Sequence, residues 1–197
     1  YAASLICELH PDWSVHIYEV GDSEIKDQDS MGLKSVIVGS PYEALTKGRY
    51  FGFGGATAKW GGQILTFSDK DFKNPNRYQR EIVDLNLKYR QNVFKKVGIK
   101  NDYPEIVLED GMFTKTGVWL DYFSWNLFKK FKVDSFSHVT LHPHYRIAKL
   151  QIDNKKIVGF EAINDGKTIF VDGYDHYFLA TGAFETSRIL MMSGVQD

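Results

Sequence analysis

The chain has little cysteine: Cys7 is the only one among 197 residues, so no disulfide can form within it. Because lasting disulfides are typical of oxidising compartments, we expect a reducing, cytoplasmic location. A long apolar run is also missing, since no stretch approaches the roughly 18 residues of a membrane-spanning helix, and no secretory signal pattern is visible. The net charge is only −1, from 24 Lys and Arg against 25 Asp and Glu. We therefore expect no integral membrane segment and no nucleic-acid partner.

The chain does not begin with Met. Residues 1–9 predict a helix that has no N-cap residue before it, and residues 191–197 close another predicted helix without a following element. We expect the chain to be an internal fragment of a longer protein.

Secondary-structure signals alternate between strand and helix. Apolar periodicity predicts helices at residues 76–96, with Gly98 as a stop, 119–131 and 183–192. The aromatic residues of 119–131 indicate core packing rather than substrate stacking. β-Branched and aromatic residues predict strands at 15–19, 35–38, 138–141, 144–152, 156–163, 168–171 and 174–179. Strand–helix units at both ends, with a β-meander between them, predict an α/β fold with a parallel sheet.

The most unusual stretch is residues 52–63, which place five glycines around a tryptophan. Glycine allows positive φ angles and a close approach of the backbone to a planar ligand. Surface turns usually place Asn, Asp, Ser or Pro beside glycine, whereas the neighbours here are Phe53, Trp60, Ile64 and Leu65. We favour a ligand-contacting loop over a surface turn.

Three segments, in this order, resemble the FAD-binding half of the glucose–methanol–choline (GMC) oxidoreductase family, with its pyranose-oxidase-like, sugar-oxidising branch the most similar. The first is the strand that ends at Glu19, and the second is Gly48-Arg49 followed by the glycine-rich residues 54–62. The third is residues 177–194, where a strand opens through Ala-Thr-Gly into a helix. The resemblance implies a Rossmann-like FAD-binding fold with a parallel sheet, an inserted β-meander and helices.

The same resemblance implies a cofactor site. An acid at Glu19 binds the hydroxyls of the adenosine ribose, and Ile147, within one position, lies at the adenine edge. The implied cofactor-binding residues are Glu19, Arg49, Gly54, Gly55, Ala56, Thr57, Trp60, Gly61, Gly62, Ile147, Ala180, Thr181 and Gly182. For Trp60, flavin or substrate contact and core packing remain equally open.

The resemblance also implies a division of the chain. Residues 1–67 and 132–197 would form the nucleotide-binding core, and residues 68–131 a helical insertion or the start of a substrate (cap) region. The strand with the G-x-G-x-x-G fingerprint would lie upstream of Tyr1, between strands 15–19 and 174–179. We therefore expect those two strands to be close but not hydrogen-bonded to each other.

The implied activity is oxidation of a CH–OH group of an alcohol or sugar by hydride transfer to FAD, which an unknown electron acceptor then reoxidises. Covalent relatives carry a flavin-linked histidine where Lys59 stands, so we expect non-covalent FAD. The family's catalytic base would lie beyond Asp197, so the catalytic residues are unknown. His142 and His144 would face the same side if both lay in one strand, but without a third ligand we expect no metal site.

The chain departs from the family pattern in two further ways, and two alternative functions stay open. The Gly-Trp-Pro of many relatives is absent between Phe72 and Leu87, and the phosphate-binding fingerprint is absent from the chain. The alternatives are a non-catalytic flavin- or nucleotide-binding module and an inactive truncated fragment.

Overall fold

The computed structural model describes residues 1–195 except 34, 44–46, 101–102, 110 and 122–124. Contacts divide the chain into two compact units, Tyr1–Lys59 with Asn126–Asp197, and Trp60–Trp125. The division expected from the sequence was residues 1–67 with 132–197 as one part and residues 68–131 as the other. The nucleotide-binding role of the first part and the cap role of the second stay predictions. Within the described residues, no helix combines the length and apolarity needed to cross a membrane.

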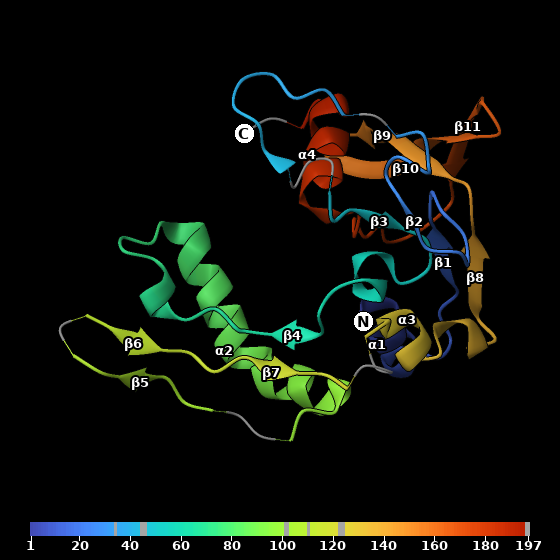
Figure 1. The fold of residues 1–197 in the computed structure, drawn as a ribbon. Helices are drawn as coiled ribbons and strands as arrows, with labels where there is room; N and C mark the ends of the chain where they lie inside the picture. Colours follow the sequence, from blue (N-terminus) through green and yellow to red (C-terminus); the bar gives the residue numbers. More distant parts are fainter. Residues whose placement is uncertain (34, 44–46, 101–102, 110, 122–124, 196–197) are drawn as a thin grey trace. The chain divides into compact units, whose positions relative to one another are not determined.

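The first unit contains a parallel pair of strands, β1 (Val15–Tyr18) and β8 (Val139–His142). They run side by side in Figure 1, and α1 (Ala2–Leu9) precedes β1 as predicted. The structure thus mixes helix and strand and has a two-stranded parallel sheet. A complete Rossmann-like sheet stays a prediction.

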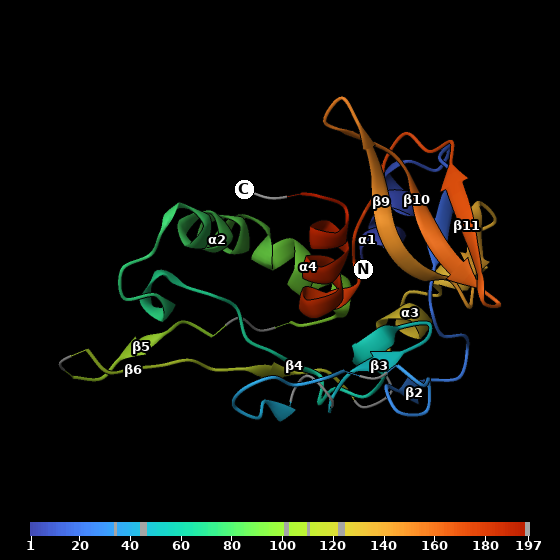
Figure 2. The same cartoon turned by 90° about the horizontal axis from the view of Figure 1, so that it is seen from above.

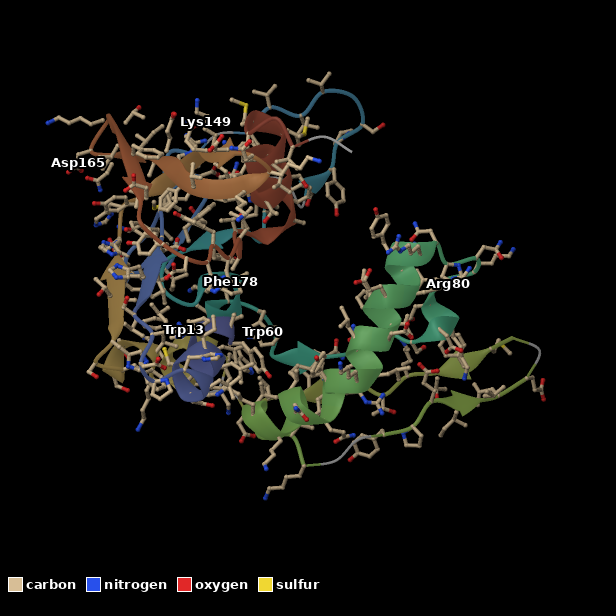
Figure 3. The ribbon with its side chains drawn as sticks, turned by 180° about the vertical axis from the view of Figure 1, so that it is seen from behind. Trp13, Trp60, Arg80, Lys149, Asp165 and Phe178 are labelled. Atoms are coloured by element: carbon tan, nitrogen blue, oxygen red, sulfur yellow. The ribbon has the colours of Figure 1, made fainter. Side chains whose placement is uncertain are left out.

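An antiparallel meander follows, in the order β11–β10–β9, as the sequence predicts. Its strands are β9 (Arg146–Asp153), β10 (Lys156–Asn164) and β11 (Lys167–Asp172). Asp165 lies at the β10–β11 turn, where Figure 3 labels it, and its positive φ of 49° suits a tight hairpin. Figure 2 shows α4 (Gly182–Met192) beside β9. Ile189 of α4 is buried there in the core with Leu150, Phe160 and Ala162.

Short elements complete the first unit. β2 (Lys26–Asp27) pairs with β3 (Tyr50–Phe51), 3₁₀ helices span Gly55–Ala58 and Val133–Ser135, and α3 covers Leu127–Lys130. The predicted strand at 35–38 is wrong. Val36 and Val38 are 86% and 92% exposed, so neither burial nor a neighbouring strand stabilises an extended ladder there.

The segment 174–179 forms no strand, which corrects a second prediction. A strand needs backbone hydrogen bonds to a neighbour, and no described segment supplies them. Side chains nevertheless bring the segment to β1: the hydroxyls of Tyr18 and Tyr174 lie 2.7 Å apart, and the rings of Trp13 and His176 stack at 5.2 Å. The expected proximity without pairing to β1 is therefore confirmed, although the segment is not a strand.

The second unit is built on α2 (Arg77–Val97), which the sequence predicts closely. Asn76 accepts a hydrogen bond from the Gln79 N–H, and the Gln79 side chain in turn accepts from the Asn76 N–H. Gly98 ends the helix at φ 84°. Both ends are thus determined by local residues.

Short strands and a 3₁₀ helix make up the rest of the second unit. β4 (Gln63–Ile64) pairs with β7 (Val118–Trp119), β5 (Ile106–Val107) pairs with β6 (Phe113–Thr114), and a 3₁₀ helix spans Asp69–Asp71. The predicted helix at 119–131 is wrong. Trp119 pairs with Gln63 as a strand residue, only the four residues of α3 are helical, and positions 122–124 lie outside the described residues. Pairing with a distant segment overrides the helical periodicity.

Candidate functional site

A pocket opens in the first unit beside the end of β1, the start of β9 and α4. Its cavity volume is about 100 Å³, within about 640 Å³ of empty space that includes open solvent. Four predicted cofactor residues line it together: Glu19, Arg49, Ile147 and Thr181. The other lining residues are Tyr18, Val20, Leu33, Ser35, Phe51, Tyr145, Arg146, Glu185 and Ile189.

Glu19 directly follows β1, and two main-chain groups orient its carboxylate. Oε1 accepts hydrogen bonds from the N–H of Gly21 at 3.0 Å and of Gly52 at 2.9 Å. No described residue donates to Oε2. Glu19 therefore offers the pocket one oriented oxygen that can only accept hydrogen bonds, which suits a ligand hydroxyl.

The end of β1 packs backbone to backbone against the start of the glycine-rich loop. A Cβ at Gly21 would lie 2.6 Å from the nitrogen of Gly52, and Gly52 itself has φ 124°. The Phe53 N–H donates to the Asp22 carbonyl at 2.8 Å. Only glycine allows this approach, so the two sequence segments that resemble cofactor motifs are joined here by main-chain contact as well as by the Glu19 carboxylate.

The connection from β8 to β9 holds the opposite side of β1. The Tyr145 N–H donates to the Glu19 carbonyl at 2.9 Å, and the His144 N–H donates to the Gly21 carbonyl at 3.2 Å. These bonds place the first residues of β9, Arg146 and Ile147, at the pocket beside Glu19.

A chain of charged side chains crosses the pocket wall. Arg49 donates to Glu185 at 2.9 Å, and Arg188 donates to the other oxygen of Glu185 at 2.8 Å. Burial alone would raise the pKa of Glu185, but the bonds from Arg188 and Arg49 outweigh it and lower that pKa below its ordinary value. Glu185 is therefore a stable anion between two cations.

The start of α4 supplies Thr181, whose Oγ1 lies 2.9 Å from Oγ1 of Thr186. Gly182 begins the helix with φ 78°. Ala180 and Gly182 flank Thr181 in sequence but do not line the pocket. Their cofactor roles stay predictions.

Four glycine-rich-loop residues of the first unit also lie outside this pocket. The missing Cβ of Gly54 would overlap the Asn126 side chain, so that position is filled by protein. Gly55, in contrast, is open, with the Tyr50 carbonyl as the nearest atom at 3.9 Å. Ala56 and Thr57 belong to the 3₁₀ helix, in which the Thr57 hydroxyl donates to the Gly54 carbonyl.

The remaining predicted residues, Trp60, Gly61 and Gly62, belong to the second unit. Trp60 donates through Nε1 to the Trp125 carbonyl at 2.8 Å, and a Cβ at Gly62 would overlap the Trp125 indole. Within its own unit Trp60 is thus hydrogen-bonded to the Trp125 main chain, both of its interpretations stay predictions, and Gly62 is required by a close contact.

Aromatic and imidazole rings lie behind the pocket. His16 Nδ1 and His142 Nε2 are 2.9 Å apart, and Tyr18, which lines the pocket, stacks on His142 at 4.2 Å. Burial first, and the charge of His16 second, lower the pKa of His142. Burial and the bond to Tyr174 raise the pKa of Tyr18. Within the described residues, no group of three or more His, Cys, Asp or Glu could hold a metal ion.

Sequence reasoning missed the polar part of the pocket wall. Ser35, Arg146 and Glu185 line the pocket, and Gln28, only 1% exposed, donates to Ser35 and accepts from Arg49. One signal was available for Glu185, because an acid in the first turn of the predicted helix at 183–192 is stabilised as an anion by the helix dipole.

Comparison with models of known protein families, and with curated proteins, finds no match to this chain. Its function is therefore inferred from the residues of the site.

Proposed function

We propose that the chain is the cofactor-binding part of an FAD-dependent oxidoreductase that acts on CH–OH groups of an alcohol or sugar. One observation carries the proposal. Residues from all three segments that resemble the GMC family line a single pocket: Glu19 after β1, Arg49 before β3, and Thr181 before α4. Ile147, the predicted adenine-edge residue, joins them.

The donors and acceptors of the pocket fit the adenosine end of FAD. The Oε2 of Glu19 can accept from ribose hydroxyls, and Ile147 offers an apolar edge to the adenine ring. Arg146 and Arg49 supply positive charge, and the N-terminus of α4 favours an anion.

The residues proposed for the flavin end in the first unit are Gly54, Gly55, Ala56 and Thr57, while the cofactor roles of Trp60, Gly61 and Gly62, in the second unit, stay sequence-based predictions. Among them Gly55 is the open position at which backbone could approach a flat ring. FAD would supply hydride acceptance when bound, and this chain would bind and orient it non-covalently. The base that would take the hydroxyl proton is not assigned to any described residue.

The proposal extends to a small-molecule alcohol or sugar substrate, a separate electron acceptor and a cytoplasmic location. The last of these rests on the single cysteine, Cys7, which is buried and unpaired.

Flavin binding is the first test. The chain is produced with riboflavin supplied, its absorbance spectrum is recorded, and the apoprotein is titrated with FAD. Bound flavin that is released by denaturation, together with weaker binding by Glu19→Ala, would support the proposal. A colourless protein that does not respond to FAD would refute it.

Gly55→Val tests the flavin end separately. Valine meets no close neighbour at this position but is strained at its φ of 50°, so some loss of thermal midpoint is expected, and flavin content should fall by more than that loss explains. Full flavin occupancy in Gly55→Val would show that Gly55 does not contact the flavin.

The second candidate is a nucleotide-binding module without redox activity. It is favoured by the pocket itself, whose described residues match an adenosine group and include no candidate base. If AMP and FAD bind equally well and no alcohol or sugar is turned over with an artificial electron acceptor, the second candidate replaces the first.

A further inference from the structure

We propose that Glu185 is a positioning residue whose carboxylate, by bridging Arg49 and Arg188, fixes the spacing of two pocket walls and slows the departure of a bound ligand. We call these three side chains the Arg–Glu–Arg bridge. The identity of the ligand as FAD rests on the proposed function, whereas the bridge itself rests on geometry within the first unit.

Both oxygens of Glu185 are used. Oε1 accepts from Nη2 of Arg49 at 2.9 Å, and Oε2 accepts from Nε of Arg188 at 2.8 Å. The Arg49 and Glu185 side chains are only 17% and 25% exposed, so water screens this pair less than a surface pair. One carboxylate therefore connects a residue beside β3 with α4.

The Arg49 end of the bridge reaches one wall of the pocket. Its Nη1 donates to Gln28 Oε1 at 3.0 Å, and Gln28 Nε2 donates to Ser35 Oγ at 3.0 Å. Gln28 is almost fully buried, so its amide cannot turn to water if Arg49 moves. The position of Ser35 at the pocket thus depends on Arg49.

The Arg188 end reaches the opposite wall. Its Nη2 donates to the Ile147 carbonyl at 2.7 Å, and its Nη1 donates to the Ala148 carbonyl at 3.2 Å. These carbonyls belong to β9, at the proposed adenine edge. Glu185 is thereby connected through side chains to Ser35 on one wall and to Ile147 on the other.

Charge makes Glu185 the critical member. Two guanidinium groups share one carboxylate, and within the described residues neither pairs with another acid. Replacing Glu185 by Gln leaves two cations close together in a partly buried place, where their repulsion separates the two walls. The expected result is a looser pocket, with the β-meander core left intact.

A matched control lies on the meander, where Figure 3 labels Lys149. Glu161 of β10 pairs with Lys149 at 3.1 Å and accepts from Gln151 at 2.6 Å, and its side chain is 26% exposed. It matches Glu185 in chemistry, number of partners and exposure, but it does not line the pocket. Glu161→Gln therefore shows how much the loss of a similar carboxylate outside the pocket changes the rate of FAD release.

The experiment measures FAD dissociation from the chain by flavin fluorescence after a chase with excess competitor. We expect Glu185→Gln to release FAD about tenfold faster, the size expected for one partly buried charge-assisted hydrogen bond. Glu161→Gln should stay within about twofold. The double variant Glu185→Gln with Arg49→Gln leaves a single cation and no repulsion, so it should release FAD no faster than Glu185→Gln alone.

Equal release by wild type and Glu185→Gln, or equal acceleration by Glu161→Gln, would overturn the proposal. If Glu185→Gln does not fold, Arg49→Lys replaces it. Lysine cannot donate to Glu185 and Gln28 at once with the fork geometry of arginine, so faster release is again expected.

Hydrogen exchange without ligand separates the bridge from the proposed function. The Leu33 N–H, which donates to the Gln28 carbonyl at 3.0 Å, reports the wall that depends on Arg49. Its exchange should accelerate in Glu185→Gln and not in Glu161→Gln, whether or not FAD binds. If the wild-type chain binds no FAD but Leu33 exchange still accelerates in Glu185→Gln and not in Glu161→Gln, FAD is refuted as the ligand and the role of the Arg–Glu–Arg bridge is supported. If Leu33 exchange is unchanged in Glu185→Gln, the role of the bridge is refuted.

Discussion

Replacing Glu19 by Ala should cost both stability and ligand affinity, and the structure separates the two effects. The Oε1 of Glu19 accepts from two main-chain N–H groups, on Gly21 and Gly52, and both glycines are buried. Water therefore cannot easily replace the lost acceptor. Its Oε2 has no described protein partner and is left for a ligand.

The magnitudes follow from these contacts. An unsatisfied buried donor costs about 1–3 kcal/mol, so two donors in Glu19→Ala should lower the free energy of unfolding by about 2–6 kcal/mol. Loss of a hydroxyl acceptor should weaken FAD binding by a further factor of about 5–150, or roughly 1–3 kcal/mol. Glu19→Gln keeps a neutral oxygen for the glycines, so its loss of stability should be only about 1 kcal/mol.

The assays are urea unfolding of the ligand-free chain and titration with FAD. Glu24→Ala is the control, since that side chain is 76% exposed and its removal should change stability by no more than about 0.5 kcal/mol. An unfolding free energy of Glu19→Ala equal to that of Glu24→Ala would refute the anchoring role of the carboxylate. Unchanged FAD affinity in Glu19→Gln and Glu19→Ala would refute its ligand role.

Three further outcomes are expected. Because the pKa of His142 is lowered by folding, the folded chain binds fewer protons than the unfolded chain near and below the ordinary value of 6.5. The free energy of unfolding should therefore decrease as the pH is lowered. Urea unfolding of His142→Gln should show a weaker dependence on pH between about pH 7.5 and 5.5. Gly54→Ala should lower the thermal midpoint strongly because its Cβ would overlap Asn126, whereas Gly55→Ala, with open space around it, should cost only about 1–2 kcal/mol; equal losses would contradict the packing at Gly54. Asn76→Ala should reduce helix stability by about 1 kcal/mol, seen by circular dichroism as earlier melting, and no change would show that the capping box contributes nothing.

Elements whose signals are local could be predicted from the sequence. α2 is bounded by Asn76 and Gly98, which act within one turn of the helix ends, and the meander turns at Asp165 through its own backbone preference. The failures depend on partners. Trp119 is a strand residue because Gln63 pairs with it, and residues 174–179 are not a strand because no described segment pairs with them.

The same distinction between local signals and distant partners applies to the residues of the site. Glu19 could be found because an acid at the end of a strand is a recognisable position, and Ile147 because the family resemblance implies an adenine-edge residue there. Gln28 and Arg188 could not, since their hydrogen bonds join distant loops and leave no spacing in the sequence. Gly54 was expected to face a ligand, but the same lack of a side chain serves packing against Asn126, and sequence cannot tell these two uses of glycine apart.

The parallel pairing of β1 with β8 has a consequence for the order in which the chain folds. Val15 pairs with Val139, so the whole second unit lies within the loop that this pairing closes, while the meander pairs only neighbouring strands. Closing a long loop costs more entropy than forming a hairpin, so the meander should form early and the β1–β8 ladder late. Glu19 reaches Ile147 only when that ladder closes. A pocket ligand would then act on the slowest step of folding, by holding the two ends of the loop together and slowing their separation.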